Sequence, residues 1–400
     1  MQITVLCKVV DNFGDIGVAW RFCRRLAKIQ SKYKICLIVD DLEAFSKIED
    51  RLPRQATKQS IIIDGIEIFP WQNDDLCHEV FSQNDGERLS IILELFQCGR
   101  PDWMERILFE EKLNRTVHII MIDYLTAEKY AEDFHCLQSL TRSAKVQKVN
   151  FMPGFTEKTG GLVIDEEWQE VPEYNADGSV LIFTYEKDWT DLVNGWLSST
   201  ECVRSLSDVE GAKQQHATKL LIAQGRGKES FMQAVKKVVE CSRSECIETT
   251  FIEELPYLNQ TEWDQMMKGC SSLVIRGEES MSRACLSGIP FIWHAYPQSD
   301  EYQLVKVKAL LERMRPHFDE ADFEIVEKAW MAINTNDESL SEALSLRAEG
   351  EAIYSSDYTN FFNSLLRLRP GFLSFALSLR KNGDLAANLM TFIKKIGIIE

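Results

Sequence analysis

The residues with the most evident chemical potential in this sequence follow its first apolar run. Residues 3–10 (ITVLCKVV) are typical of a buried strand, and from Val18 onward apolar side chains recur at helical spacing. The turn between these elements contains two carboxylates, Asp11 and Asp15, and two glycines but no lysine. In an open α/β sheet, ligands bind at such a turn, at the carboxyl end of a strand. Two carboxylates there could hold a positively charged group and accept a proton from it.

Both aspartates also have a purely structural interpretation. An aspartate just before a helix is a good N-cap, which would suit Asp15, and Asp11 fits a turn. One such residue alone would be assigned to capping. Two of them in a single glycine-bearing loop leave the structural and the functional interpretation about equally favoured.

A second set of polar residues lies within residues 273–298 (LVIRGEESMSRACLSGIPFIWHAYPQ). This stretch is typical of a strand, a polar turn, a helix and another strand. We expect Ser280 to cap a helix that begins at Met281, and the backbone N–H groups of such a helix start bind phosphate. Arg276 could add bidentate contacts to the same anion.

Two acidic residues, Glu278 and Glu279, fit that anion site only if they bind sugar hydroxyls or orient Arg276. An acidic first turn that stabilises the helix dipole explains them equally well. Upstream, Tyr257 and Trp263 flank Gln260, and two aromatic rings with an amide could stack on and read a pyrimidine. Taken alone, these aromatic residues are better explained by core packing.

Other motifs of nucleotide and metal chemistry are missing from the sequence. GRGKES at 225–230 lacks the spacing of a phosphate-binding P-loop, so it is interpreted as a polar loop before a helix. The opening turn is not the GxGxxG of dinucleotide-binding proteins. None of the six histidines forms HExxH or a close pair, so a metal site is not expected.

Bulk composition narrows the class of protein. A chain of 400 residues favours two domains, and a net charge of −17 argues against a surface for nucleic acid or anionic membranes. Eleven cysteines without a CxxC pair indicate reduced thiols rather than disulfides. With neither a leader peptide nor a long apolar segment in the sequence, we expect a cytoplasmic protein.

Apolar runs alternate with helical patterns, which indicates βαβ units and mainly parallel sheets. The expected strands are residues 3–10, 35–40, 60–63, 66–69, 89–96, 117–122, 149–152, 180–185, 219–224, 249–254, 273–275 and 291–294. Residues 154–179 are rich in glycine, proline and acids and are expected to connect two Rossmann-like domains that face each other across a cleft. Residues 385–397 (LAANLMTFIKKIG) predict an amphipathic helix near the end of the chain.

Several stretches resemble, in chain order, the bacterial protein-arginine rhamnosyltransferases that modify elongation factor P. They are VVDNFGDIGVAWR, IDYLTAEKY, FMPGFTEKTGGL, FTYEKDW, VIRGEESMSRA and PFIWHAYPQ, and the resemblance spans about residues 3–303. It implies an α/β GT-B fold, with an acceptor domain at 1–153, a connection at 154–179, a donor domain at 180–330 and a helical tail at 331–400. The tail would pack on the first domain.

The resemblance also implies the reaction: transfer of L-rhamnose from dTDP-L-rhamnose to an arginine side chain of elongation factor P, with inversion and without a metal. By matching motif, Asp15 is the general base and Asp11 its companion, and we include Glu278 among the catalytic residues. Tyr257 and Trp263 would enclose thymine, with Gln260 at its edge. The other residues expected to bind the donor are Asn12, Phe13, Gly14, Phe183, Tyr185, Arg276, Glu278, Glu279, Ser280, Tyr296 and Gln298.

Three stretches depart from the family pattern. The family has GEDS where this chain has Glu279 in GEES, phenylalanine at both base-stacking positions, and EYLSAE where residues 123–128 read DYLTAE. An acid that replaces an acid, or an aromatic residue that replaces an aromatic one, can keep the same role. Two alternatives stay open: a GT-B transferase with another nucleotide sugar or acceptor, and a non-catalytic translation-factor-binding module.

An arginine acceptor would explain why the opening turn contains two acids. A guanidinium is delocalised, has a pKa above ~12 and is a poor nucleophile. Two carboxylates can hold its nitrogens, favour charge away from the attacking nitrogen and accept its proton as the bond forms. A lysine in that turn would repel the substrate.

Overall fold

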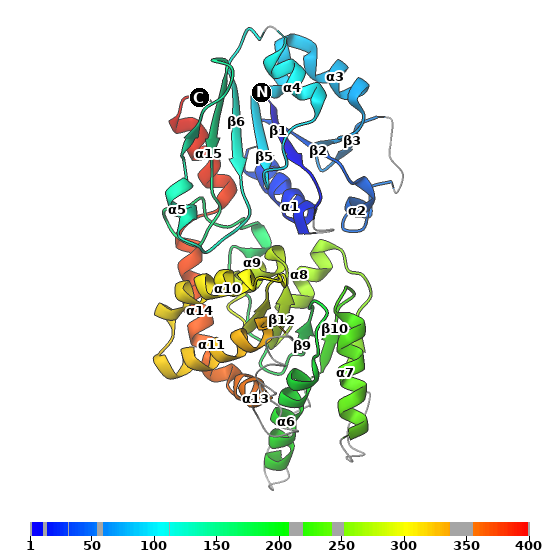
Figure 1. Cartoon of the computed structure of the whole chain (residues 1–400), viewed down its shortest axis with the longest axis vertical. Helices are drawn as coiled ribbons and strands as arrows, with labels where there is room; N and C mark the ends of the chain where they lie inside the picture. Colours follow the sequence, from blue (N-terminus) through cyan, green and yellow to red (C-terminus); the bar gives the residue numbers. More distant parts are fainter. Residues whose placement is uncertain are drawn as a thin grey trace. The chain divides into compact units, whose positions relative to one another are not determined.

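The computed structural model describes residues 2–10, 14–30, 32–53, 59–111, 113–207, 219–241, 252–336 and 355–398. The chain forms two compact units (Figure 1). Unit 1 consists of Met1–Gln169 and Leu379–Glu400, and unit 2 consists of Glu170–Ser378. The chain therefore passes from one unit to the other twice, the second time within a continuous helix, α14 (Leu365–Lys381).

Unit 1 is built on an eight-stranded sheet with the order β3-β4-β2-β1-β5-β6-β8-β7. Its strands are β1 (Gln2–Cys7), β2 (Lys34–Val39), β3 (Ile61–Ile63), β4 (Ile66–Pro70), β5 (Ile91–Leu95), β6 (Val117–Ile122), β7 (Gln138–Ser139) and β8 (Val146–Asn150). The sheet is parallel except at its edges, where β3 pairs antiparallel with β4 and β7 with β8. All six residues of β1 are buried, as expected for a central parallel strand covered on both faces.

Helices cover both faces of this sheet. On β1, Ile3 and Val5 point into one hydrophobic core, which α1 (Gly14–Ile29) and α15 (Leu385–Lys395) complete. Leu6 points into the other core, together with α3 (Asp74–Ser82) and α4 (Asp102–Phe109). The remaining helices are α2 (Leu42–Ser46), α5 (Tyr130–Phe134) and the short η1 (Gln83–Leu89) and η2 (Glu166–Trp168).

The stretch FMPGFTEKTGGL (residues 151–162) is a loop that meets the start of α15, where the backbone N–H of Leu385 donates to the carbonyl oxygen of Leu162 at 2.8 Å. The N-cap residue of α15, Asp384, accepts hydrogen bonds from the backbone N–H groups of Ile164 (2.8 Å) and Ala387 (3.1 Å). Gly161 has a φ of +81°, and a Cβ there would lie 2.5 Å from the carbonyl oxygen of Gly383. The glycine is therefore required by both conformation and space.

Unit 2 contains a five-stranded parallel sheet with the order β11-β10-β9-β12-β13. Its strands are β9 (Val180–Ile182), β10 (Leu220–Ile222), β11 (Ile252–Glu254), β12 (Ser272–Arg276) and β13 (Phe291–His294). Its helices are α6 (Thr190–Ser207), α7 (Lys228–Cys241), α8 (Gln260–Lys268), α9 (Glu278–Ser287), α10 (Tyr302–Met314), η4 (Arg315–His317), α11 (Glu320–Asn334), α13 (Ser355–Asn363) and most of α14.

Two helix starts differ from the expectation. The first helix begins at Gly14 rather than Val18, so Asp15 lies in its first turn and not in a loop. Helix α9 begins at Glu278 rather than Met281, with Gly277 as its N-cap, so Ser280 is not the capping residue. The first turn of α1 (GDIG) holds a single apolar residue, Ile16, and that of α9 (EES) holds none, so neither turn showed apolar periodicity in the sequence.

The loop after β10 agrees with the expectation. The loop at 225–230 does lead into a helix, since α7 begins at Lys228. Eight cysteines within the described residues are free thiols, and six of them are buried. In the described part of the chain, no helix has the length and apolar character that a membrane span needs.

Candidate active site

Asp15 lies at the carboxyl end of β1, buried in the first turn of α1 with only 4% of its surface exposed. Its Oδ2 accepts a hydrogen bond from the backbone N–H of Val10 at 2.8 Å, which ties the start of the helix to the end of the strand. The helix dipole favours a carboxylate in this turn. The other expected residues of this turn, Asp11, Asn12 and Phe13, lie outside the described residues, and Gly14 is the first residue of α1.

A thiol next to Asp15 is kept out of the chemistry. Cys7 is fully buried at the end of β1, and burial together with the charge of Asp15 raises the pKa of its thiol. A protonated thiol is a poor nucleophile. Asp15 is therefore the better candidate for proton transfer at this strand end.

Ionic contacts fix the helix that carries Asp15. Arg21, only 1% exposed, pairs with Asp165, and the Nε of Arg25 donates to Asp384 at 3.1 Å. Asp384 is the N-cap residue of α15, and Asp165 follows Ile164, whose backbone N–H donates to Asp384. These two ion pairs fix α1 to other segments of unit 1.

In unit 2, Arg276 at the end of β12 stands between aromatic rings. Its Cζ lies 4.5 Å from the ring centroid of Phe183 and 4.5 Å from that of Tyr185. Trp263 contacts Phe183 edge-on at 5.0 Å between centroids, and Tyr296 contacts Tyr185 at 5.3 Å. These residues come from four separate segments of the chain, and the folding of unit 2 brings them together.

The Nε of Arg276 is buried, and within the described residues it has no hydrogen-bond partner. A buried guanidinium N–H without a partner is costly, so such groups are normally satisfied. Stacking covers the faces of a guanidinium, so an anion would approach in its plane, toward the terminal N–H groups. This feature points to a ligand such as a phosphate.

Helix α9 begins two residues after Arg276. The residue between them, Gly277, has a backbone conformation that other residues rarely adopt. Gly277 has a φ of +76°, with open space where a Cβ would lie. The first turn contains half-buried Glu278 and Glu279 and buried Ser280. The carboxylate of Glu279 lies 3.7 Å from the Nε of buried Arg283, one turn further along the helix. Glu279 thus has a partner within its own helix.

The expected base-binding residues surround the start of α8. Asn259 caps this helix through a capping box with Glu262, which fixes Gln260 at its first position. Trp263 is half-buried and Tyr257 is 70% exposed. Core packing therefore does not account for Tyr257.

Sequence reasoning missed His294, which ends β13 and is 2% exposed. Its Nδ1 accepts a hydrogen bond from the backbone N–H of Tyr185 at 3.2 Å. Burial lowers the pKa of His294 to about 3, and the nearby charges of Lys187 and Arg276 contribute to the lowering. His294 is therefore a neutral acceptor that positions Tyr185. Its place at the carboxyl end of an expected strand was the one signal that could have identified it.

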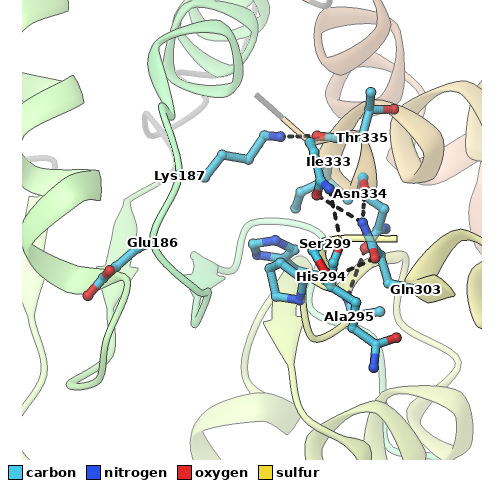
Figure 2. Close-up of a pocket in the computed structure, with 12 residues that line it drawn as sticks. Glu186, Lys187, His294, Ala295, Ser299, Gln303, Ile333, Asn334 and Thr335 are labelled. Carbon is cyan, nitrogen blue, oxygen red and sulfur yellow. Dashed lines mark hydrogen bonds between the residues drawn. The ribbon is translucent and has the colours of Figure 1, made fainter. Parts of the chain in front are cut away.

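Beside His294 lies a cavity of about 350 Å³ within unit 2 (Figure 2). Gln298 and Ser299, from the loop after β13, line it together with Lys187 and the ends of α10 and α11. The ammonium group of Lys187 donates to the carbonyl oxygen of Thr335 across this cavity. Gln298 is thus the expected donor-binding residue that faces this space.

Candidate metal ligands do not gather in the part of the chain that the structure describes. No three side chains of histidine, cysteine, aspartate or glutamate lie there in an arrangement that could hold an ion.

Comparison with known proteins agrees with the sequence resemblance. The family model of the elongation factor P (EF-P) rhamnosyltransferase EarP matches residues 3–394. The protein-arginine rhamnosyltransferase of Shewanella oneidensis is 29% identical over 336 residues, which cover 77% of this chain and 79% of that protein. The protein of the same name from Pseudomonas aeruginosa is 27% identical over 329 residues, covering 77% and 80%.

Solved structures show the fold. A structure of EarP that addresses arginine glycosylation of translation elongation factor EF-P matches with a TM-score of 0.54 at 16% identity, over 98% of this chain and 99% of that one. A UGT transferase from Siraitia grosvenorii in complex with UDP matches with a TM-score of 0.52 at 8% identity, over 99% of both chains. The expected α/β GT-B class with a helical C-terminal segment is thereby confirmed. Because its family model matches nearly the whole chain, the protein belongs to the EarP family of elongation factor P rhamnosyltransferases and is a glycosyltransferase.

Proposed function

We propose that this enzyme transfers L-rhamnose from dTDP-L-rhamnose to an arginine side chain of elongation factor P, with inversion at the anomeric carbon. The observation that carries the proposal is the stacked guanidinium of Arg276, whose buried Nε is unpaired within the described residues, beside the start of α9. Family membership supports the choice of sugar and acceptor. Because elongation factors act in translation, we propose that the reaction takes place in the cytoplasm.

The donor diphosphate would bind Arg276 and the first backbone N–H groups of α9. Negative charge grows on the diphosphate as it leaves, and preorganised donors stabilise that charge in the transition state. Tyr185, stacked against the guanidinium, would help to hold the ribose, and Ser280 lies in the first turn of α9. Glu278 would bind a sugar hydroxyl or orient Arg276 in the reacting complex.

The acceptor guanidinium would bind Asp15 and Asp11. Asp15 is buried, so its attraction for a guanidinium is weakened less by water than that of an exposed carboxylate. It would accept the proton as the nitrogen attacks the anomeric carbon. With the carboxylates at the nucleophile and none required as a covalent partner, a single displacement inverts the configuration.

The direct test is turnover. The purified chain, incubated with elongation factor P and dTDP-L-rhamnose, should add one rhamnose to one arginine, as measured by intact and peptide mass spectrometry. UDP-glucose and dTDP-glucose serve as competing donors. An equal or greater yield with another nucleotide sugar would support a different GT-B transferase, and no transfer from any donor would support a binding module.

The aromatic residues near α8 give a prediction for donor binding. Trp263→Ala and Tyr257→Ala should each weaken dTDP binding by about 1–3 kcal/mol, the range for stacking of a nucleobase on an aromatic ring. Calorimetry with dTDP measures this. Tyr302→Ala, at another exposed tyrosine of unit 2, is the matched control and should bind dTDP normally. Unchanged affinity in both test variants would remove these residues from the proposed site.

A second prediction concerns metals. Arginine and helix N–H groups can neutralise a diphosphate without a divalent ion. We therefore expect the transfer rate to be the same in excess EDTA as in magnesium-containing buffer, measured with metal-stripped elongation factor P. Activity that disappears with EDTA and returns with magnesium or manganese would contradict this.

A further inference from the structure

The loop after β13 is held by buried amide side chains from two helices. It contains Tyr296 and Gln298, which belong to the proposed donor site, so any role of this loop in donor binding rests on the proposed function. Tyr296 is 53% exposed, and its ring contacts Tyr185 edge-on at 5.3 Å. A side chain this exposed has few neighbours to fix it. Its position must therefore come largely from the loop backbone.

Asn334 fixes the first part of this loop. It is the last residue of α11 and is 3% exposed. Its Oδ1 accepts from the backbone N–H of Ala295 at 2.9 Å, and its Nδ2 donates to the carbonyl oxygens of Trp293 and Trp330, both at 2.8 Å. One amide thereby holds the backbone immediately before Tyr296.

Gln303 fixes the other side of the loop. It is the second residue of α10 and is 1% exposed. Its Oε1 accepts from the backbone N–H of Gln298 at 3.0 Å, and its Nε2 donates to the carbonyl oxygen of Asn334 (3.1 Å) and to Oδ1 of Asn336 (3.0 Å). The Nδ2 of Asn336 in turn donates to the carbonyl oxygen of Gln298 at 3.0 Å. Figure 2 shows Gln303 and Asn334 side by side next to Ala295.

These contacts bracket Tyr296 and Pro297. Proline has no N–H, so the segment from Ala295 to Gln298 offers three backbone donors, and the amides of Asn334 and Gln303 accept two of them. Both amides use their oxygen and their nitrogen in this network, which makes them rigid supports. They lie 31 residues apart in the chain and meet only in the folded unit.

We propose that Asn334 and Gln303 are positioning residues for the donor: they set the backbone that presents Tyr296 and Gln298 to dTDP-L-rhamnose. Neither needs to touch the donor. Each acts through a loop N–H that its side-chain oxygen accepts. Loss of these two acceptors should therefore displace the loop more than it lowers the stability of unit 2.

A hydrogen bond made by Trp330 serves as a control, because it joins α11 to β13 without contacting the loop. Trp330 lies one turn before Asn334 on α11, and its Nε1 donates to the carbonyl oxygen of Phe291 at the start of β13, at 2.8 Å. It joins the same helix to the same strand but at the end away from the loop. If the amides only attach helices to the sheet, Trp330→Phe should affect the enzyme as they do.

The experiment compares donor affinity, by calorimetry with dTDP-L-rhamnose, with melting temperature in the full-length enzyme. Gln303→Met and Asn334→Leu remove the acceptors at nearly constant volume, and each should weaken donor binding about 10-fold, as for a buried bond left unmade. Gln303→Glu and Asn334→Asp keep the accepting oxygen but lose the donors to the helices. These should lower the melting temperature while donor affinity stays within about threefold of wild type. Trp330→Phe should lower the melting temperature alone.

The outcomes are separable. Wild-type enzyme that does not bind dTDP-L-rhamnose would contradict the proposed function itself, before any variant is measured. Wild-type binding, with donor affinity in Gln303→Met and Asn334→Leu no weaker than in Trp330→Phe, would overturn the positioning role. If both apolar variants fail to fold, Asn336→Ala at its half-buried site provides the folded test, and it should raise the KM for donor without changing the KM for elongation factor P. An unchanged donor KM would overturn the proposal.

Discussion

Replacement of Asp15 by asparagine should lower the rate of rhamnosyl transfer by about 100-fold or more, the scale on which general-base catalysis contributes. The substitution keeps the size of the side chain and an oxygen that can accept the N–H of Val10, the bond that Asp15 makes at 2.8 Å. It removes the charge and the proton acceptor. Single-turnover transfer to elongation factor P measures the loss, and calorimetry with dTDP should show nearly normal donor affinity.

The chain offers a matched control at the same strand end. Asp40 accepts the backbone N–H of Val9 at 2.7 Å, one residue before the N–H that Asp15 accepts. Asp40→Asn therefore makes the same chemical change to the same kind of bond, and it should transfer rhamnose normally. If Asp15→Asn also transfers at a near-wild-type rate, Asp15 is only a structural link between β1 and α1.

The parallel sheets were the most predictable part of this fold. Buried parallel strands are continuous apolar runs, and the expected bounds of β6 (117–122) and β13 (291–294) agree with the structure. Strand β7 (Gln138–Ser139) was missed because both of its residues are polar, so they show no alternation of apolar and polar side chains. It exists only because the chain turns back beside β8.

The starts of α1 and α9 were less predictable because their first turns hold too few apolar residues to show a helical period. Asp15 in α1 and Glu278 in α9 carry no apolar periodicity, so the expected starts were several residues late. The backbone at Gly277, with a φ of +76°, turns directly from strand to helix. A glycine in a sequence permits that conformation without requiring it.

The resemblance placed Phe183, Tyr185 and Arg276 in one expected donor site, but the sequence did not predict how these residues contact one another. Arg276 was identified from its place before a helix, yet the rings of Phe183 and Tyr185 that flank it come from another segment of the chain. Gln303 and Asn334 left no signal, because an amide within a helix looks like an exposed residue in sequence. Only tertiary packing buries these two amides and directs them to the same loop.

Arg276→Ala should weaken binding of dTDP-L-rhamnose by about 10- to 100-fold, the range for lost hydrogen bonds to a charged group. The variant removes the flat cation between Phe183 and Tyr185 and the buried Nε that has no partner within the described residues. Arg276→Lys keeps the charge but loses the planar fork, so its affinity should lie between alanine and wild type. Calorimetry with dTDP and with thymidine separates diphosphate from base: thymidine affinity should hardly change.

A second stacked arginine in the same unit supplies the control. The Cζ of Arg315 lies 4.1 Å from the ring centroid of Phe323, so Arg315→Ala also removes a cation from an aromatic face. Arg315 belongs to η4, which carries none of the residues of the proposed donor site. The Arg315→Ala variant should leave donor affinity unchanged. Equal affinities of Arg276→Ala and wild type for dTDP would show that the stacked guanidinium serves the packing of β12 rather than the diphosphate. Equal losses for dTDP and thymidine would instead indicate a collapsed aromatic cluster. A loss confined to dTDP requires that Arg276 acts on the phosphates, where charge develops as rhamnose leaves.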